Sequence, residues 1–295
     1  LMGYAVNSFR ALDATVIGIF GALEEVGLWY VLFMLSKPYA FSGLLSNITY
    51  GELLERGRSG VYRDLLMVLY TATAISLSYI FFEPLFMNFL RPRDPQYAAP
   101  LLTPIALWAA ANVLGALNQF LGNIMQGVDK RDIAGGEIKA RAYLGSLVLY
   151  AHLAELVFTV VYLASMVPLI YLFRRAGVEL YAIMGVVASS FLANAVAFAF
   201  RFTKAEGRVR PLIGGSLAKD YLAPTLAASA ALYAASSVVR FPLVPSVYVS
   251  LAEVAAAIVL TASVYLAASL AISRTSRELL ALAARSASRL LRDIT

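Results

Sequence analysis

The sequence contains no cysteine, a single histidine and few charged residues for its length. Without cysteine neither a disulfide nor a thiolate metal site can form, and His152 alone excludes a site with several histidine ligands. Charged residues make up 14% of the 295 residues, whereas an average soluble domain carries about 25%. No glycine-rich phosphate loop or other catalytic pattern occurs either. These absences argue against an enzyme.

Hydrophobic residues dominate instead, at 60% of the chain, and they stand in long runs. A helix needs about 20 apolar residues to cross a bilayer. Runs of that kind cover residues 1–21, 26–51, 62–90, 98–127, 143–173, 178–202, 221–239 and 245–272. Their backbone groups must pair within each segment, and the alternation of barrel strands is missing. The sequence therefore predicts an all-α integral membrane protein with about eight transmembrane helices.

Basic residues are distributed unevenly among the predicted connections. Of the 24 Lys and Arg residues, 17 fall in the connections and tail on one side, and five fall on the other side. Cytoplasmic loops carry such an excess. We therefore expect a multi-pass protein of the cytoplasmic membrane with a cytoplasmic C-terminus, whose net charge of +6 reflects topology and not nucleic-acid binding. Residues 273–295 alternate arginine with leucine, which predicts a basic amphipathic surface helix or, alternatively, a solvated terminus.

Ionisable side chains within the predicted spans are the first candidates for function, because such residues usually face a cavity or a partner. Arg10 and Lys37 are suited to attract an anionic head group such as a phosphate. Asp13 and Glu155, with His152 close to Glu155, are candidates for coupling to Na⁺ or H⁺. The structural alternatives are that Arg10 and Asp13 neutralise each other, and that His152 is a hydrogen-bonded residue of the bundle.

Amide side chains form a stripe on the predicted helix 98–127. Asn112, Gln119 and Asn123 share one face by their spacing. Such a stripe either makes hydrogen bonds to neighbouring helices or forms the wall of a hydrophilic cavity, and the sequence leaves both interpretations open.

Three stretches of the chain are similar to a known family. Leu12–Gly21, followed by Glu25–Tyr30, resembles the seventh-helix motif of polysaccharide flippases in the multidrug/oligosaccharidyl-lipid/polysaccharide exporter superfamily. Asn118–Gly127, leading into Val128–Lys130, resembles the family's tenth helix, and Gly177–Ala182 resembles the start of its twelfth.

The resemblance implies two six-helix lobes around a central cavity with alternating access. Residues 1–205 would be the second lobe, 206–272 two additional helices and 273–295 the tail, with a first lobe missing before the chain. It also implies a cation site that includes Asp13. In place of the family's Asn and Asp on the eleventh helix stand His152 and Glu155. The family's cationic cavity would make Arg10 and Lys37 contacts of the head group.

The resulting expectation is flippase-like transport of lipid-linked oligosaccharides, with no cofactor besides a coupling Na⁺ or H⁺. A multidrug cation antiporter of the same superfamily is one alternative, and it would favour an aromatic, acidic cavity. A membrane scaffold for glycan assembly, without transport, is another. Packed burial of Arg10, Lys37 and Glu155 would favour the scaffold.

Overall fold

The computed structural model describes residues 12–55, 60–92, 95–129, 144–212, 216–239, 241–244 and 246–281. Within these ranges the regular structure is entirely helical, which confirms the all-α class. The α-helices are α2 (Asp13–Phe20), α3 (Leu23–Ser36), α4 (Ala40–Glu55), α5 (Val61–Phe81), α6 (Glu83–Leu90), α7 (Ala98–Val128), α9 (Leu147–Arg175), α10 (Tyr181–Val209), α11 (Ala223–Val238) and α12 (Val247–Ile272). Short turns of other helix types are η1 (Lys37–Tyr39), η2 (Pro95–Tyr97), η4 (Arg210–Leu212) and the π-helical η5 (Ala218–Leu222).

Five of the described helices are long and apolar enough to span a membrane: α5, α7, α9, α10 and α12. The expectation of a multi-pass helical membrane protein is therefore confirmed, whereas the count of about eight spans is not. The predicted span 26–51 is divided at Lys37, because Pro38 has no N–H to continue the hydrogen-bond ladder. The predicted span 62–90 likewise ends at Phe81, and Pro84 lies in the first turn of the separate helix α6. α11 is short, with 16 residues.

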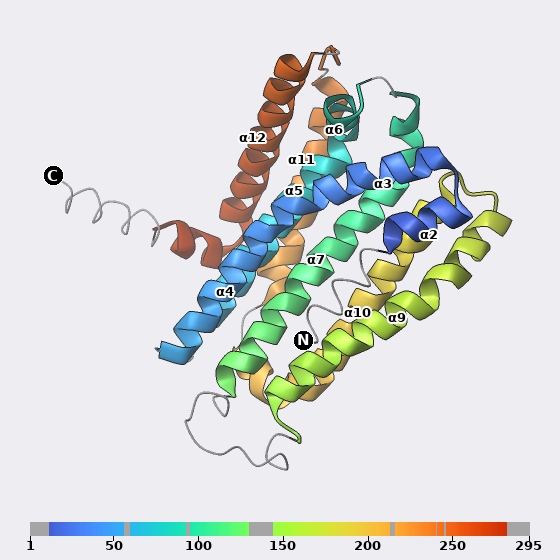
Figure 1. The fold of residues 1–295 in the computed structure, drawn as a ribbon. Helices are drawn as coiled ribbons and strands as arrows, with labels where there is room; N and C mark the ends of the chain where they lie inside the picture. Colours follow the sequence, from blue (N-terminus) through green and yellow to red (C-terminus); the bar gives the residue numbers. More distant parts are fainter. Residues whose placement is uncertain are drawn as a thin grey trace.

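The predicted first span and the basic tail are described only in part. α2 begins at Asp13, and Arg10 lies outside the described residues. After α12, residues 274–281 are helical and leave the α12 axis at an angle, as Figure 1 shows, while 282–295 lie outside the described ranges. Arg274 in this stretch is exposed and pairs with Glu278 one turn later at 3.1 Å.

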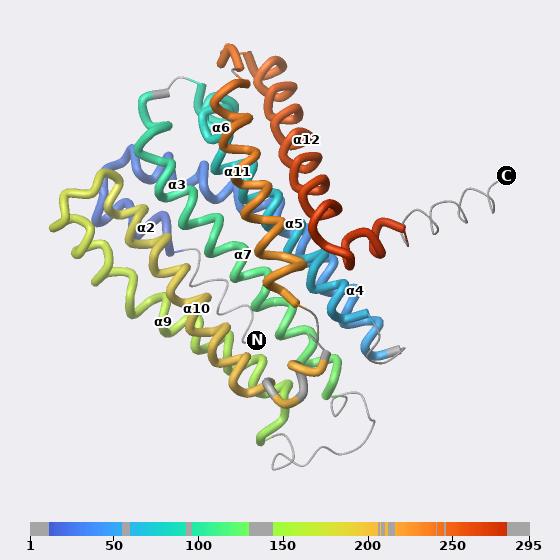
Figure 2. Tube along the Cα trace, turned by 180° about the vertical axis from the view of Figure 1, so that it is seen from behind, coloured from blue at the N-terminus to red at the C-terminus, as the bar shows by residue number. Residues whose placement is uncertain are grey.

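α7 lies at the centre of the bundle. Figure 1 shows the pair α9 and α10 on one side of it and α4 and α5 on the other, and the view from behind in Figure 2 shows α11 and α12 beside α5. Asp129, just after α7, accepts a hydrogen bond from the Leu147 N–H at 2.8 Å and so fixes the start of α9 beside the end of α7. α9 thus runs back along the bundle.

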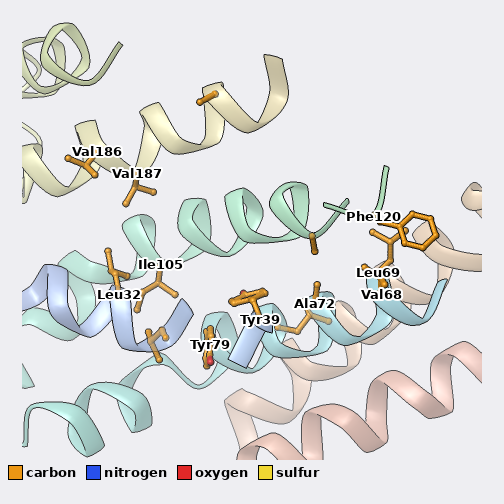
Figure 3. Close-up of a cluster of buried hydrophobic side chains, with 14 of the residues drawn as sticks. Leu32, Tyr39, Val68, Leu69, Ala72, Tyr79, Ile105, Phe120, Val186 and Val187 are labelled. Carbon is orange, nitrogen blue, oxygen red and sulfur yellow. The ribbon is translucent and has the colours of Figure 1, made fainter. Parts of the chain in front are cut away.

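The buried apolar cluster in Figure 3 has α7 in its middle. Ile105 and Phe120 of α7 are each at most 1% exposed. On one side they face the cluster contributed by α3, η1 and α5, and on the other side Val186 and Val187 of α10. α7 is therefore packed against neighbouring helices on both of these sides.

α9 and α10 approach each other very closely at Gly185. A Cβ atom at this position of α10 would lie 2.3 Å from Ile170 Cγ1 and 2.7 Å from the Ile170 backbone nitrogen on α9. Membrane helices use small residues in this way to bring backbones together. Gly185 therefore sets the spacing of the two helices that carry much of the site described below.

The acidic corner after α2 has a structural role. Glu25 is 4% exposed, and its Oε2 accepts hydrogen bonds from the Ala182 and Ile183 N–H groups at 3.1 Å each. These are free N–H groups in the first turn of α10, where a negative charge is favoured by the helix dipole. The Tyr181 hydroxyl donates to the Phe20 carbonyl at 2.7 Å. Together these bonds attach the α2–α3 corner to the start of α10.

A second polar cluster joins α5, η5 and the segment after α12. Asp220 is 8% exposed, and its carboxylate accepts hydrogen bonds from Tyr62 at 2.9 Å, Ser273 at 2.7 Å and Thr275 at 3.2 Å. The backbone carbonyl of Asp220 accepts another from Tyr70. One carboxylate thus connects three parts of the chain that are far apart in sequence.

Candidate functional site

A polar cavity of about 490 Å³ lies among α2, η1, α4, α7, α9 and α10. Six residues singled out by sequence line it: Asp13, Asn112, Gln119, Asn123, His152 and Glu155. The fold therefore brings together side chains from α2, α7 and α9 that lie as far apart in sequence as Asp13 and Glu155. Their roles in transport remain predictions. Asn118, Gln126, Ser190, Asn194 and Arg201 add further polar groups to the same wall.

Asp13 is held in place from α9. The Tyr162 hydroxyl donates a hydrogen bond of 2.5 Å to Asp13 Oδ1, and Tyr162 is itself 4% exposed. Tyr162 is stacked on Phe158, with ring centroids 5.8 Å apart. A carboxylate fixed by a buried phenol is a well-oriented acceptor for a cation or a proton.

Glu155 and Arg201 form an ion pair in the cavity wall between α9 and α10. The Arg201 side chain is 4% exposed and that of Glu155 is 45% exposed. Glu155 is eight residues after the start of α9 and Arg201 is eight residues before the end of α10, so the pair lies roughly 12 Å inside the helices. A buried guanidinium requires a counter-ion at this depth, and Glu155 supplies it.

Arg201 is a correction to the charge count, since it is one of the 17 basic residues that were assigned to the connections and tail. The structure buries this residue within α10, so it no longer contributes to the charge excess in the loops. The sequence did carry a signal: Phe202 and the apolar residues before Arg201 continue the hydrophobic run of 178–202. The predicted span 178–202 thus already contains Arg201, and only the charge count assigned it to the connection that follows.

All three amides of the predicted stripe, Asn112, Gln119 and Asn123, line the cavity, and of these Asn123 also bonds to a neighbouring helix. Asn123 donates to Ser46 Oγ and to Asn47 Oδ1 of α4 at 2.9 Å each. Asn118 donates to the Asn194 carbonyl of α10 at 2.8 Å. These bonds link α7 to helices on either side, and the same residues line the cavity.

Two polar atoms in the cavity wall make no hydrogen bond to the described residues. Asn118 Oδ1 and Arg201 Nε are buried and have no hydrogen-bond partner among the described residues. The Asn118 amide orientation follows from its Nδ2 lying 2.8 Å and 3.3 Å from two acceptors on Asn194. Buried polar groups are rarely left without partners, so this wall holds one unused acceptor and one unused donor.

Lys37 does not line this cavity. It is exposed on η1, and its Nζ lies 3.8 Å from the centroid of the Phe33 ring in a cation–π contact. Arg10 falls outside the described residues. The proposed contact of Arg10 and Lys37 with a head group therefore stays a prediction, and for Lys37 it would require a substrate that reaches the outer face of η1.

A second cavity, of about 340 Å³, adjoins the first. It shares Asp13, Trp108 and Asn112 with the polar cavity, but its remaining wall is mostly aromatic and includes Trp29, Tyr30 and Phe33. The rings of Trp29 and Trp108 meet edge to face with centroids 5.4 Å apart. A polar and an aromatic cavity thus meet at Asp13.

Comparison with known proteins identifies no relative: no protein-family model, no curated protein and no solved structure matches the chain. The similarity to polysaccharide flippases therefore depends on the motifs quoted above.

Proposed function

We propose that this chain forms part of a membrane transporter that moves an amphipathic, lipid-linked oligosaccharide across the bilayer. The observation that carries the proposal is the polar cavity of about 490 Å³, lined by Asp13, Glu155 and Arg201, among helices apolar enough to span a membrane. Ionisable residues at membrane depth are costly and mark substrate and ion pathways. A protein that only anchors or scaffolds has no need of them.

The adjoining aromatic cavity supports an amphipathic substrate. A lipid-linked sugar has a hydroxyl-rich part, a phosphate and an apolar tail. The amides on α7 suit the hydroxyl groups, whereas the wall with Trp29 and Phe33 suits an apolar segment. Both parts could be bound at once, because the two cavities share Asp13, Trp108 and Asn112.

The carboxylates of the site support coupling to a cation. Asp13 and Glu155 lie in the same wall as His152. This arrangement is consistent with coupling to Na⁺ or H⁺. The family resemblance also implies a cation site that includes Asp13. The same resemblance would make residues 1–205 one lobe of a two-lobe protein, with 206–272, which include α11 and α12, as additional helices.

A multidrug cation antiporter is the second candidate, and the aromatic cavity next to Asp13 favours it. Apolar cations bind to aromatic faces beside a carboxylate. A scaffold has less support, because Glu155 is half-exposed on a cavity and Lys37 is exposed.

Reconstitution separates these candidates. Proteoliposomes that contain the chain together with the other lobe that the proposal requires, and a fluorescent lipid-linked oligosaccharide in the inner leaflet, are exposed to a membrane-impermeant quencher. Flipping makes the inner-leaflet pool accessible to the quencher at a rate that empty liposomes do not show. A rate equal to that of empty liposomes, under Na⁺ and H⁺ gradients alike, would refute the proposal. Uptake of a fluorescent organic cation by the same vesicles would support the antiporter.

A matched pair of variants tests the site itself. Asp13→Asn keeps the size of the side chain and removes the charge at the junction of the cavities, so we expect transport to fall at least about tenfold. Glu179→Gln makes the same change at an exposed acid that does not line the cavity, and it should leave transport unchanged. Equal rates for both variants would exclude the cavity as the transport path.

A further inference from the structure

Arg201 combines deep burial with unused hydrogen-bonding capacity. Its side chain is 4% exposed, yet the contact with Glu155 joins only Nη2 to Oε1. Arg201 Nε has no partner among the described residues. A guanidinium normally binds an oxyanion through two parallel N–H groups. The guanidinium of Arg201 is therefore only partly used by the protein.

The partner of Arg201 is much less fixed than Arg201 itself. The Glu155 side chain is 45% exposed to the cavity, and its contact with Arg201 is its only side-chain bond given by the described residues. The guanidinium lies against Gly122 of α7, where a Cβ atom would be 3.7 Å from Nε and 3.8 Å from Nη2. The cation is held by packing, whereas the carboxylate can turn into the cavity.

We propose that Arg201 is the anion-binding residue of the cavity and that Glu155 occupies this site as an internal substitute until a phosphate displaces it. The ligand class is a pyrophosphate ester, either the monoester of a lipid or the diester that joins a lipid to a sugar. A pyrophosphate ester carries more charge than a carboxylate and can engage two nitrogens of the guanidinium together. The displaced Glu155 carboxylate then turns toward the open cavity. No covalent step is involved.

The position of Asn118 indicates how a ligand bound to Arg201 would be oriented in the cavity. Its unused Oδ1 lies in the same wall, one turn of α7 before Gly122, the residue against which Arg201 packs. A phosphate on Arg201 would therefore place an adjacent sugar hydroxyl where it can donate to Asn118 Oδ1. A phosphate-linked sugar satisfies both unused groups, whereas an organic cation has no oxyanion to accept from Arg201.

Binding to the detergent-solubilised full chain tests the proposal, with farnesyl pyrophosphate, inorganic pyrophosphate and farnesol as probes. Arg201→Gln should weaken farnesyl pyrophosphate binding at least about tenfold, and Glu155→Gln should strengthen it by about the same factor. Purely structural roles would weaken binding in both variants. The controls Arg174→Gln and Glu179→Gln make the same chemical changes at exposed residues outside the cavity and should bind like the wild type.

Measurement of thermal unfolding distinguishes a loss of binding from a loss of folding. Glu155→Gln leaves a buried guanidinium without its counter-ion, so this variant should unfold at a lower temperature and regain stability with pyrophosphate more than the wild type does. The double variant Glu155→Gln/Arg201→Gln, which lacks both charges, should show no such gain. Wild-type affinity in Arg201→Gln, or weaker binding in Glu155→Gln, would overturn the proposal, and so would equal affinity for farnesol and farnesyl pyrophosphate.

Comparison of the inorganic and the farnesyl pyrophosphate probes also identifies the source of the anion. Equal affinity for inorganic and farnesyl pyrophosphate would support a site for a free phosphate, and a preference for the farnesyl compound would support a lipid head group. The choice of ligand rests on the proposed function, but the two can fail separately. Opposite shifts in the two variants without any flipping in vesicles would leave the anion site standing and refute the flippase. Flipping without those shifts would refute the anion site alone.

Discussion

Replacing Gly185 by alanine should disrupt the contact on which the α9–α10 pair depends. The added Cβ would lie 2.3 Å from Ile170 Cγ1, 2.7 Å from its backbone nitrogen and 2.8 Å from its Cα. Carbon atoms in good contact are about 3.5–4.0 Å apart. Ile170 Cγ1 can rotate away, but the two backbone atoms cannot. α9 must therefore move locally by roughly 1 Å relative to α10.

Overpacking of this kind costs about 1–3 kcal/mol, which outweighs the gain of about 1 kcal/mol from replacing glycine by alanine within a helix. Gly207 provides the control, because it lies in the same helix and a Cβ there meets no atom within 4 Å. Gly207→Ala should be neutral or stabilising by up to about 1 kcal/mol.

Equilibrium unfolding of the purified protein in mixed micelles with increasing dodecyl sulfate gives both free energies. We also expect Gly185→Ala/Ile170→Ala to recover only part of the loss, since the Ile170 backbone atoms remain in place. If the variants Gly185→Ala and Gly207→Ala were equally stable, this result would contradict the close approach of α9 and α10 at Gly185. Gly185 would then no longer explain the helix spacing that allows Glu155 of α9 to pair with Arg201 of α10.

Three further substitutions probe other parts of the fold by the same unfolding measurement. Asp220→Ala should cost at least about 2 kcal/mol, because Tyr62 and Ser273 lose their shared acceptor, and Asp220→Asn should cost less; equal stability of all three proteins would contradict this. Glu25→Ala should cost about 1–3 kcal/mol, because the Ala182 and Ile183 N–H groups lose their acceptor, and Glu25→Gln, which keeps an acceptor oxygen, should cost less; equal stability of both variants and the wild type would contradict this. Burial raises the pKa of Glu83, in α6 outside the candidate spans, to about 8; its folded-state pKa lies above the unfolded value, so stability should fall as pH rises from about 5 to 9, by roughly 4 kcal/mol. Glu83→Gln should match the wild type at pH 5 and exceed it at pH 9, and an unchanged pH profile would refute the assignment.

The class of the protein could be predicted from sequence because lipid imposes a simple rule on long apolar runs. The number of spans could not, because it depends on where a run is interrupted. Pro38 and Pro84 are present within the runs 26–51 and 62–90, and a proline there favours a kink or a helix end. Whether the chain after a proline continues in the same direction depends on packing, and the structure starts new helices at both places.

The candidate site was partly accessible by the same logic. Asp13, His152 and Glu155 stand out because ionisable groups are rare in apolar runs, and all three line one cavity. Arg201 was missed because it stands at the end of a run, where an arginine is expected to reach water. Its burial results from packing against Gly122 of α7. The sequence also placed Lys37 within a span, and no feature of the sequence indicated that η1 leaves this side chain exposed.

The contacts between α7 and α10 have a mechanical consequence. Gly115 faces Asn194, and Gly122 faces Arg201, so the two helices run in parallel and their contacts repeat with the same step. A slide of either helix by one residue would break all of these contacts together. α9 adds the close contact at Gly185, so small residues join α7, α9 and α10 into one closely packed group. Under the proposed transport function, a change of access to the cavity would therefore come from α2 and α3, which contact this group through the hydrogen bonds of Asp13 and Glu25.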